Sequence, residues 1–295
     1  MKRKWILYCF ALWLVACSPE PPHPPTIIME GWIDAGGHPV VLIHKSSVLD
    51  SLEGSAKSIE ELAEEQLIPF GKVTISDGTN EVILTGRLDT AYMPPYTYSS
   101  LDMTGQVGKT YTVTAKYNDF FASAQTTIPP VASLDSLNVN TANPERVGIT
   151  AFMSHIDPTT DSYYALFVRK AGEKQYRLCP FCVFDGKDAE NGKMEMRLYN
   201  PYGETNQIGT ETHHFRNDPE KPVQEKSYQL KVARIDYASY QFWKAYNEQI
   251  ITRGILFVPI YKNIPGNVEG GYGIVSGMGS SVYLFNIAKD TTYRF

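Results

Sequence analysis

The chain has 295 residues, of which 27 are Lys or Arg and 32 are Asp or Glu, so its formal net charge is −5. Nucleic acid and anionic lipid headgroups are bound by basic surfaces, so this charge balance argues against both as partners. The length is sufficient for two domains of ordinary size behind an N-terminal leader.

The N-terminus predicts a lipoprotein signal peptide over residues 1–16. Residues 2–4 are basic, and residues 5–16 form an apolar run shorter than the roughly 20 residues that span a bilayer. The run ends in the sequence LVAC at 14–17, which matches a lipobox. We therefore predict cleavage before Cys17 and a diacylglyceryl and acyl (palmitate-type) lipid on that cysteine as the membrane anchor.

Residues 17–25 predict a stiff tether, because five prolines occur within residues 18–25. In the polyproline II conformation, at roughly 3.1 Å per residue, it would hold the first domain about 25 Å from the membrane. Ser18, rather than Asp, follows the cysteine, which favours transport to the outer membrane. Glu20 is the only acidic residue near the anchor, so both the periplasmic face and the cell surface stay open.

Residues 26–130 predict an N-terminal antiparallel β-sandwich domain of immunoglobulin or transthyretin type, because short alternating segments are separated by turns. One turn is expected at 77–80, where the sequence DGTN separates two such segments. A helix is expected over 58–66, with Ser58 and Glu61 as its capping box. The expected strands are 26–34, 40–43, 71–76, 81–85, 109–117 and 120–128.

Three tyrosines mark a candidate binding loop between two of these strands. Tyr92, Tyr96 and Tyr98 lie around Met93-Pro94-Pro95, and rigid aromatic side chains beside proline provide contact surface at low entropic cost. The alternative is that these tyrosines only cover the edge of the domain.

Residues 131–295 predict a second β-rich domain with one helix. A helix capped by Asp236 carries Tyr237, Tyr240 and Trp243 close to one stripe, which is expected to pack on a sheet, with a ligand contact as the alternative. The glycines of segment 266–279 are expected to permit unusual backbone angles or the close approach of another chain segment. The expected strands are 146–154, 162–169, 194–199, 227–235 and 281–287.

Cys179 and Cys182 flank Pro180-Phe181 in a strand–turn–strand context, which predicts a structural disulfide across the turn. Outside the cytoplasm such a pair should oxidise. Closing so small a loop stabilises the fold by roughly 2 kcal/mol. The alternative is thiol–disulfide chemistry, although that chemistry favours a cysteine at a helix N-terminus.

No catalytic, metal or cofactor site is predicted. His213 and His214 are adjacent, and neighbouring side chains on a strand point to opposite faces, which disfavours a shared metal. The glycines at 270–273 do not open a helix in a βαβ unit, and neither a phosphate-loop lysine nor a Gly-x-Ser-x-Gly turn occurs.

Several segments together resemble the Bacteroidota lipoproteins grouped as Domain of Unknown Function 4249. They are the lipobox, IMEGWI at 28–33, GKTY at 108–111, YQFW at 240–243 and NVEGGYG at 267–273. The likeness covers nearly the whole mature chain, and the Cys179/Cys182 pair is not one of its features. The resemblance implies an outer-membrane lipoprotein, often encoded beside a TonB-dependent receptor, with no established reaction and no active-site residues.

We therefore expect a non-enzymatic accessory binding component of a TonB-dependent transport system, held to the outer membrane by its lipid. One alternative is an adhesin-like or envelope-structural protein that binds through the tyrosine loop. Another is an envelope thiol–disulfide protein that uses Cys179 and Cys182.

Overall fold

The computed structural model describes residues 26–46, 66–202, 213–252 and 264–295. The predicted signal peptide, Cys17 and the Pro-rich tether lie outside these residues. So does the helix expected over 58–66, apart from Gln66.

The mainly β prediction is confirmed, and the described residues contain one α-helix, α3 (Tyr237–Thr252). Short 3-10 helices occur at η2 (Pro144–Arg146), η3 (Gly186–Asp188) and η4 (Val223–Lys226). The strands are β1 (Ile27–Asp34), β2 (Val40–Lys45), β3 (Lys72–Ser76), β4 (Glu81–Leu88), β5 (Tyr96–Ser99), β6 (Thr110–Tyr117), β7 (Phe120–Thr127), β8 (Ser136–Asn140), β9 (Gly148–Met153), β10 (Tyr163–Lys170), β11 (Arg177–Asp185), β12 (Met194–Arg197), β13 (Ser227–Ile235), β14 (Val268–Glu269), β15 (Gly271–Asn286) and β16 (Thr291–Arg294).

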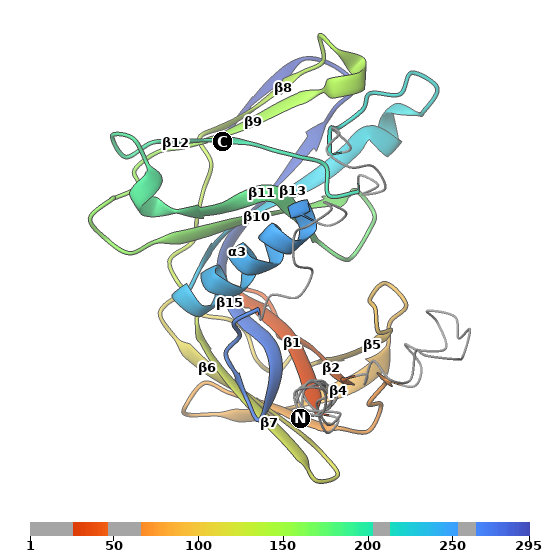
Figure 1. Ribbon diagram of the computed structural model, residues 1–295, viewed down its shortest axis with the longest axis vertical. Helices are drawn as coiled ribbons and strands as arrows, with labels where there is room; N and C mark the ends of the chain where they lie inside the picture. Colours follow the sequence, from red (N-terminus) through yellow and green to blue (C-terminus); the bar gives the residue numbers. More distant parts are fainter. Residues whose placement is uncertain (1–25, 47–65, 203–212, 253–263) are drawn as a thin grey trace, which may run out of the picture.

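The strands form two lobes, which appear as the lower and upper parts of Figure 1. The N-terminal lobe contains β1 to β7 and β14, and the C-terminal lobe contains β8 to β13, β16 and α3. A twelve-stranded sheet, in the order β11-β10-β13-β15-β1-β2-β5-β4-β3-β6-β7-β14, continues through both lobes. A four-stranded sheet, in the order β12-β9-β8-β16, forms the second layer of the C-terminal lobe.

The long strand β15 joins the two lobes. Its first half pairs in parallel with β1, from Ile27 opposite Gly271 to Asp34 opposite Met278. Its second half pairs antiparallel with β13. The sequence predicted only the end of this strand, from residue 281, because the preceding glycines do not show the alternation of a strand.

The glycines of β15 allow other backbone segments to approach closely, as expected from the sequence. Gly273 has a φ of +115°, and a Cβ at this position would lie 2.1 Å from the carbonyl oxygen of Met29. A Cβ at Gly279 would lie 2.3 Å from the carbonyl oxygen of Pro129. Larger residues at these positions would therefore push β15 away from its neighbours.

Each lobe has its own hydrophobic core. The N-terminal core includes Met29, Ile33 and Tyr111, and the C-terminal core includes Leu166 and Phe285. A third, smaller cluster lies beneath α3. Burial of these apolar side chains is the main favourable contribution to folding of each lobe.

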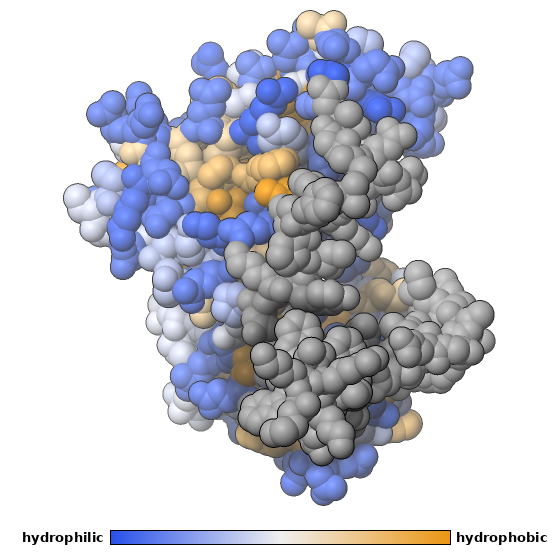
Figure 2. Space-filling view, viewed as in Figure 1, coloured by the Kyte–Doolittle hydropathy of each residue, from blue (hydrophilic) through white to orange (hydrophobic). Residues whose placement is uncertain are grey.

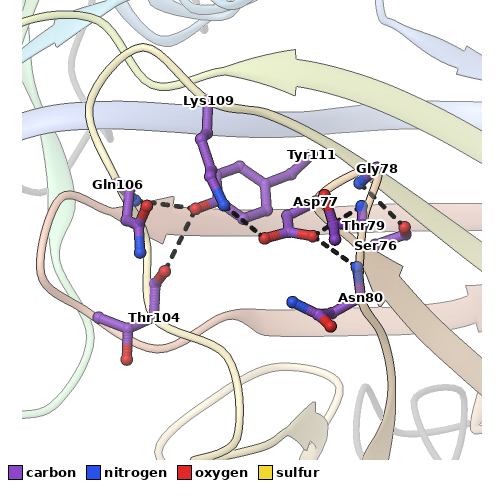
Figure 3. Close-up of polar contacts among 9 residues, drawn as sticks. All are labelled: Ser76, Asp77, Gly78, Thr79, Asn80, Thr104, Gln106, Lys109 and Tyr111. Atoms are coloured by element: carbon purple, nitrogen blue, oxygen red, sulfur yellow. Dashed lines mark hydrogen bonds and ion pairs between the residues drawn. The ribbon is translucent and has the colours of Figure 1, made fainter.

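The predicted turn at 77–80 joins β3 to β4, and its first residue holds it in place (Figure 3). Asp77 Oδ1 accepts hydrogen bonds from the backbone N–H groups of Thr79 at 3.0 Å and Asn80 at 2.7 Å. Lys109 Nζ donates to Asp77 Oδ2 at 2.6 Å. The Lys109 contact and these two N–H groups hold the pKa of the Asp77 carboxyl well below its usual range.

The predicted helix also begins as expected. Asp236 Oδ1 accepts from the backbone N–H of Ser239 at 2.8 Å, which satisfies a donor in the first turn. Tyr240 stacks on Tyr163 of β10 with ring centroids 4.6 Å apart, so this part of the aromatic stripe packs on the sheet. Tyr237, at the start of the helix, remains 55% exposed.

His44 on β2 makes the stability of the fold depend on pH. Its Nδ1 atom is buried with no hydrogen-bond partner in the described part of the chain, and desolvation lowers the pKa of His44 to about 4. Between pH 6.5 and 4 the unfolded chain binds a proton at this residue and the folded chain does not. The free energy of unfolding should therefore fall as the pH decreases through that range.

We expect His44→Gln to flatten this dependence in urea unfolding experiments performed at several pH values. His38→Gln, which removes an exposed histidine of the same lobe, serves as the matched control for the loss of a histidine side chain. Equal slopes for the wild-type protein and His44→Gln would contradict the assignment.

Candidate functional site: the interlobe pocket

A pocket of about 280 Å³ lies where β1, β10, β13 and β15 meet α3, and we call it the interlobe pocket. The alternation of side chains along β1 explains one wall of the interlobe pocket. Met29, Gly31 and Ile33 are buried toward the N-terminal lobe, whereas Glu30, Trp32 and Asp34 lie on the opposite face and line the pocket.

Five aromatic side chains line the pocket, together with five charged ones. The aromatic residues are Trp32 on β1, Tyr92 in the β4–β5 loop, Phe167 on β10, Tyr176 just before β11 and Trp243 on α3. The Trp32 and Tyr92 rings lie 5.8 Å apart, and Phe167 meets Trp243 edge to face at 5.1 Å. Such contacts hold the rings in fixed orientations, and planar rings form good contact surfaces for a small ligand.

A partly buried ion pair crosses the pocket from one lobe to the other. Lys231 Nζ of β13 lies 2.7 Å from Asp34 Oδ2 of β1, and Ser280 Oγ of β15 donates to Asp34 Oδ1 at 2.7 Å. The Lys231 side chain is 7% exposed and that of Asp34 25%. The second hydrogen bond to Asp34 offsets part of the cost of removing this pair from water.

The other cations of the pocket are also held by protein groups. Arg169 Nε donates to Gln229 Oε1 at 2.7 Å, and the Arg169 guanidinium lies 4.3 Å from the centre of the Tyr176 ring. Lys174 Nζ lies 3.0 Å from Asp89 Oδ2, which joins the β10–β11 turn to the β4–β5 loop at the pocket rim. The Lys174 hydrogen bond, with smaller contributions from other groups, lowers the pKa of Asp89.

Two polar groups of the lining differ in their access to solvent. Glu30 forms no ion pair within the described residues, and desolvation by the surrounding walls raises the pKa of its carboxyl although the side chain still reaches solvent. Trp243 Nε1 is buried and has no hydrogen-bond partner among the same residues. Of these two groups, only the Glu30 carboxyl is accessible to a ligand in the pocket.

The structure separates the three tyrosines of the predicted binding loop. Tyr92 lines the interlobe pocket, but Tyr96 and Tyr98 belong to β5. Tyr98 is 1% exposed, its hydroxyl donates to the Ile68 carbonyl, and burial raises the pKa of Tyr98 to about 12. Tyr98 is therefore a core residue and not a contact residue, and half-buried Tyr96 packs against it at 5.5 Å.

Cys179 and Cys182 lie in a bulge of β11, where the register against β10 shifts. Both are buried thiols, with their sulfur atoms 2.7 Å apart. Burial raises the pKa of the Cys182 thiol, which makes the reactive thiolate scarce and disfavours redox catalysis at this pair. The structural disulfide stays a prediction.

His213 and His214 do not form part of the interlobe pocket. His213 Nδ1 lies 3.3 Å from the Asn200 carbonyl oxygen, and desolvation is the main cause of the lowered pKa of His214. Within the described residues, no group of three or more His, Cys, Asp and Glu side chains could hold a metal ion.

Sequence reasoning missed most of the interlobe pocket. One wall could have been predicted from the alternation of side chains along β1, because this alternation places Glu30, Trp32 and Asp34 on the same face of the strand. The partners Phe167 and Lys231 lie more than 130 residues away, and no local pattern connects them with β1.

The family model described as "Domain of unknown function (DUF4249)" matches residues 17–283. No curated protein matches the chain. Among the helices of the described residues, none is long and apolar enough to cross a membrane.

The Asp34–Lys231 pair should behave as a coupled unit. Lys231→Met leaves the carboxylate without its cation and should lower the free energy of unfolding by about 3 kcal/mol. Asp34→Asn should also destabilise the fold, and the double variant should lose less than the sum of the two single losses. Urea unfolding can be followed by tryptophan emission, because Trp32 and Trp243 both line the interlobe pocket.

Lys174→Met provides the control, because the Lys174 side chain is 64% exposed. The ion pair between Lys174 and Asp89 should contribute no more than about 1 kcal/mol to the free energy of unfolding. Strictly additive losses at Asp34 and Lys231 would show that the two residues do not interact energetically.

Proposed function

The chain belongs to the DUF4249 family, and we propose that it is a non-enzymatic, lipid-anchored outer-membrane protein that binds a small ligand in the interlobe pocket as an accessory component of a TonB-dependent transport system. The observation that carries the binding role is the set of five aromatic side chains around this pocket.

The pocket favours a ligand with flat apolar faces and a few polar groups. Trp32 with Tyr92, and Phe167 with Trp243, provide two pairs of packed rings. A hydrogen-bond donor of the ligand could meet the Glu30 carboxyl. Few polar groups between apolar walls are typical of small-molecule binding sites.

The arrangement of charges supports binding rather than catalysis. Lys231 and Arg169 are both held in place by protein partners, as expected for walls with a fixed shape. Fixed side chains instead reduce the entropic cost of ligand binding.

The predicted lipid on Cys17 and the Pro-rich tether support a position at the outer membrane. A tether of this kind keeps the lobes close to the membrane while leaving them accessible to a membrane-embedded receptor. The resemblance to lipoproteins encoded beside TonB-dependent receptors supports the choice of partner.

Affinity purification tests the proposed partner. The full chain carrying a C-terminal tag is purified from detergent-solubilised outer membranes, and we expect a TonB-dependent receptor to be identified in the eluate by mass spectrometry. Cys17→Ser cannot be acylated, so it should incorporate no labelled palmitate, leave the membrane fraction and recover much less receptor. Absence of any such receptor, under conditions that preserve known membrane complexes, would contradict the proposal.

A fluorescence titration tests the pocket. Trp5 and Trp13 belong to the predicted signal peptide, so the mature chain retains Trp32 and Trp243, both of which line the pocket. We expect dialysable fractions of the growth medium to change the tryptophan emission. Tyr92→Ala should weaken the responsible interaction by roughly tenfold through loss of an aromatic contact.

The matched control is Tyr272→Ala, because Tyr272 is 64% exposed and lies outside the pocket. It should bind with wild-type affinity. Equal weakening by both tyrosine substitutions, or no emission change with any fraction, would contradict ligand binding in this pocket.

A further inference from the structure

A second hollow, of about 960 Å³, lies on the C-terminal lobe and shares no lining residue with the interlobe pocket. It is bounded by the start of β8, the end of β9, the start of β12 and the segment from Phe184 to Lys193, and we call it the β12 groove. Figure 2 shows apolar surface in this lobe, between β12 and β11, surrounded by hydrophilic side chains.

The β12 groove has an apolar floor. Met153 and Met194 are buried and lie directly opposite each other in the β9–β12 pairing. Phe152 and Phe184 are half-buried and add two aromatic rings to the lining. Methionine and phenylalanine side chains of this kind can pack against apolar side chains of a partner.

The charges around the floor are mainly negative. Four exposed acidic residues line the groove, and none of them forms an ion pair with another described residue. They are Asp135, Asp188, Glu190 and Glu195. Among the described lining residues, Lys193 is the only cation. Because most of the charges around the apolar floor are carboxylates, a partner with positive charge is electrostatically complementary to the groove.

The backbone at the groove adds a third element of recognition. Among the described strands, β12 pairs with β9 alone and lies at the edge of its sheet, so its outer side carries backbone groups that another strand could pair with. Near the C-terminal end of β12, the two cysteines of β11 cover this edge. Cys182 Sγ lies 3.4 Å from the Arg197 carbonyl oxygen, and Cys179 Sγ accepts a hydrogen bond from the Tyr199 N–H at 3.1 Å. The end at Met194 and Glu195 faces the groove instead.

We propose that the β12 groove docks an extended segment of a partner protein in which basic and apolar side chains alternate, and that this segment adds as a strand to the edge of β12. The period of two in an extended chain directs its apolar side chains to the floor and its basic side chains to the acidic rim. This docking surface is separate from the ligand pocket of the proposed function, so either one can fail without the other.

A peptide titration tests the proposal with the full chain in a nonionic detergent. The probe is a fluorescein-labelled, acetylated octapeptide of alternating Lys and Val, and binding is measured by fluorescence anisotropy. We expect saturable binding that weakens as the salt concentration rises. The double variant Glu190→Lys/Glu195→Lys should weaken binding by about tenfold or more.

The matched control is Glu220→Lys/Glu225→Lys, which makes the same change in net charge at exposed positions outside the groove. It should bind the peptide within about twofold of the wild-type affinity. Unchanged tryptophan emission and unfolding midpoints verify that both double variants are folded.

Two further peptides separate the parts of the proposal. An alternating Lys–Ser peptide lacks the apolar side chains, and a Lys–Val peptide with N-methylated backbone amides cannot add as a strand; both should bind much more weakly. No binding of the Lys–Val probe, equal loss in the two double variants, or equal affinity of either altered peptide would overturn the proposal.

Discussion

The parallel pairing of β1 with the first half of β15 is the contact on which the arrangement of both lobes depends. It brings residues 27–34 against residues 271–278, close to opposite ends of the chain. Met29 and Ile33 of β1 are then buried in the N-terminal core, whereas Glu30, Trp32 and Asp34 line the interlobe pocket. Because β15 continues without interruption into its pairing with β13, the position of β1 also fixes where Asp34 meets Lys231.

The interlobe pocket is thus a consequence of how the sheet is assembled. A charged pair that is removed from water gains little net stability, but it penalises arrangements in which either charge is left unpaired. Lys231 also lies 5.4 Å from the centre of the Tyr176 ring, and the Tyr176 hydroxyl donates to Gln229 at 3.1 Å. These contacts favour a single orientation of the pocket walls, so a ligand would meet a surface that is largely formed before it binds.

Much of the fold could be predicted from local sequence, but little of the pocket could. The DGTN turn, the alternating strands around it and the Asp236 helix cap depend on neighbouring residues, and the structure confirms them. The start of β15 was not predicted, because its glycines are required by the close approach of distant backbone segments. These segments are β1 and Pro129. Tyr98 resembled a loop residue, although burial beneath Ile68 and Gly71 places it in the core. Pairings between distant segments, such as Phe167 with Trp243, leave no local pattern.

The interlobe pocket and the β12 groove depend on different structural elements. The interlobe pocket takes side chains from both lobes, so its shape depends on β15 and on the Asp34–Lys231 pair. The β12 groove is built within the C-terminal lobe, where the buried thiols of β11 cover one end of the β12 edge and leave the other end beside the acidic rim. A change that loosens the contact between the lobes should therefore disturb ligand binding before it disturbs the groove, because the four-stranded sheet keeps its own core against β10 and β13. Because the two hollows have separate structural supports, the proposed ligand and the proposed partner segment would not compete for the same described residues.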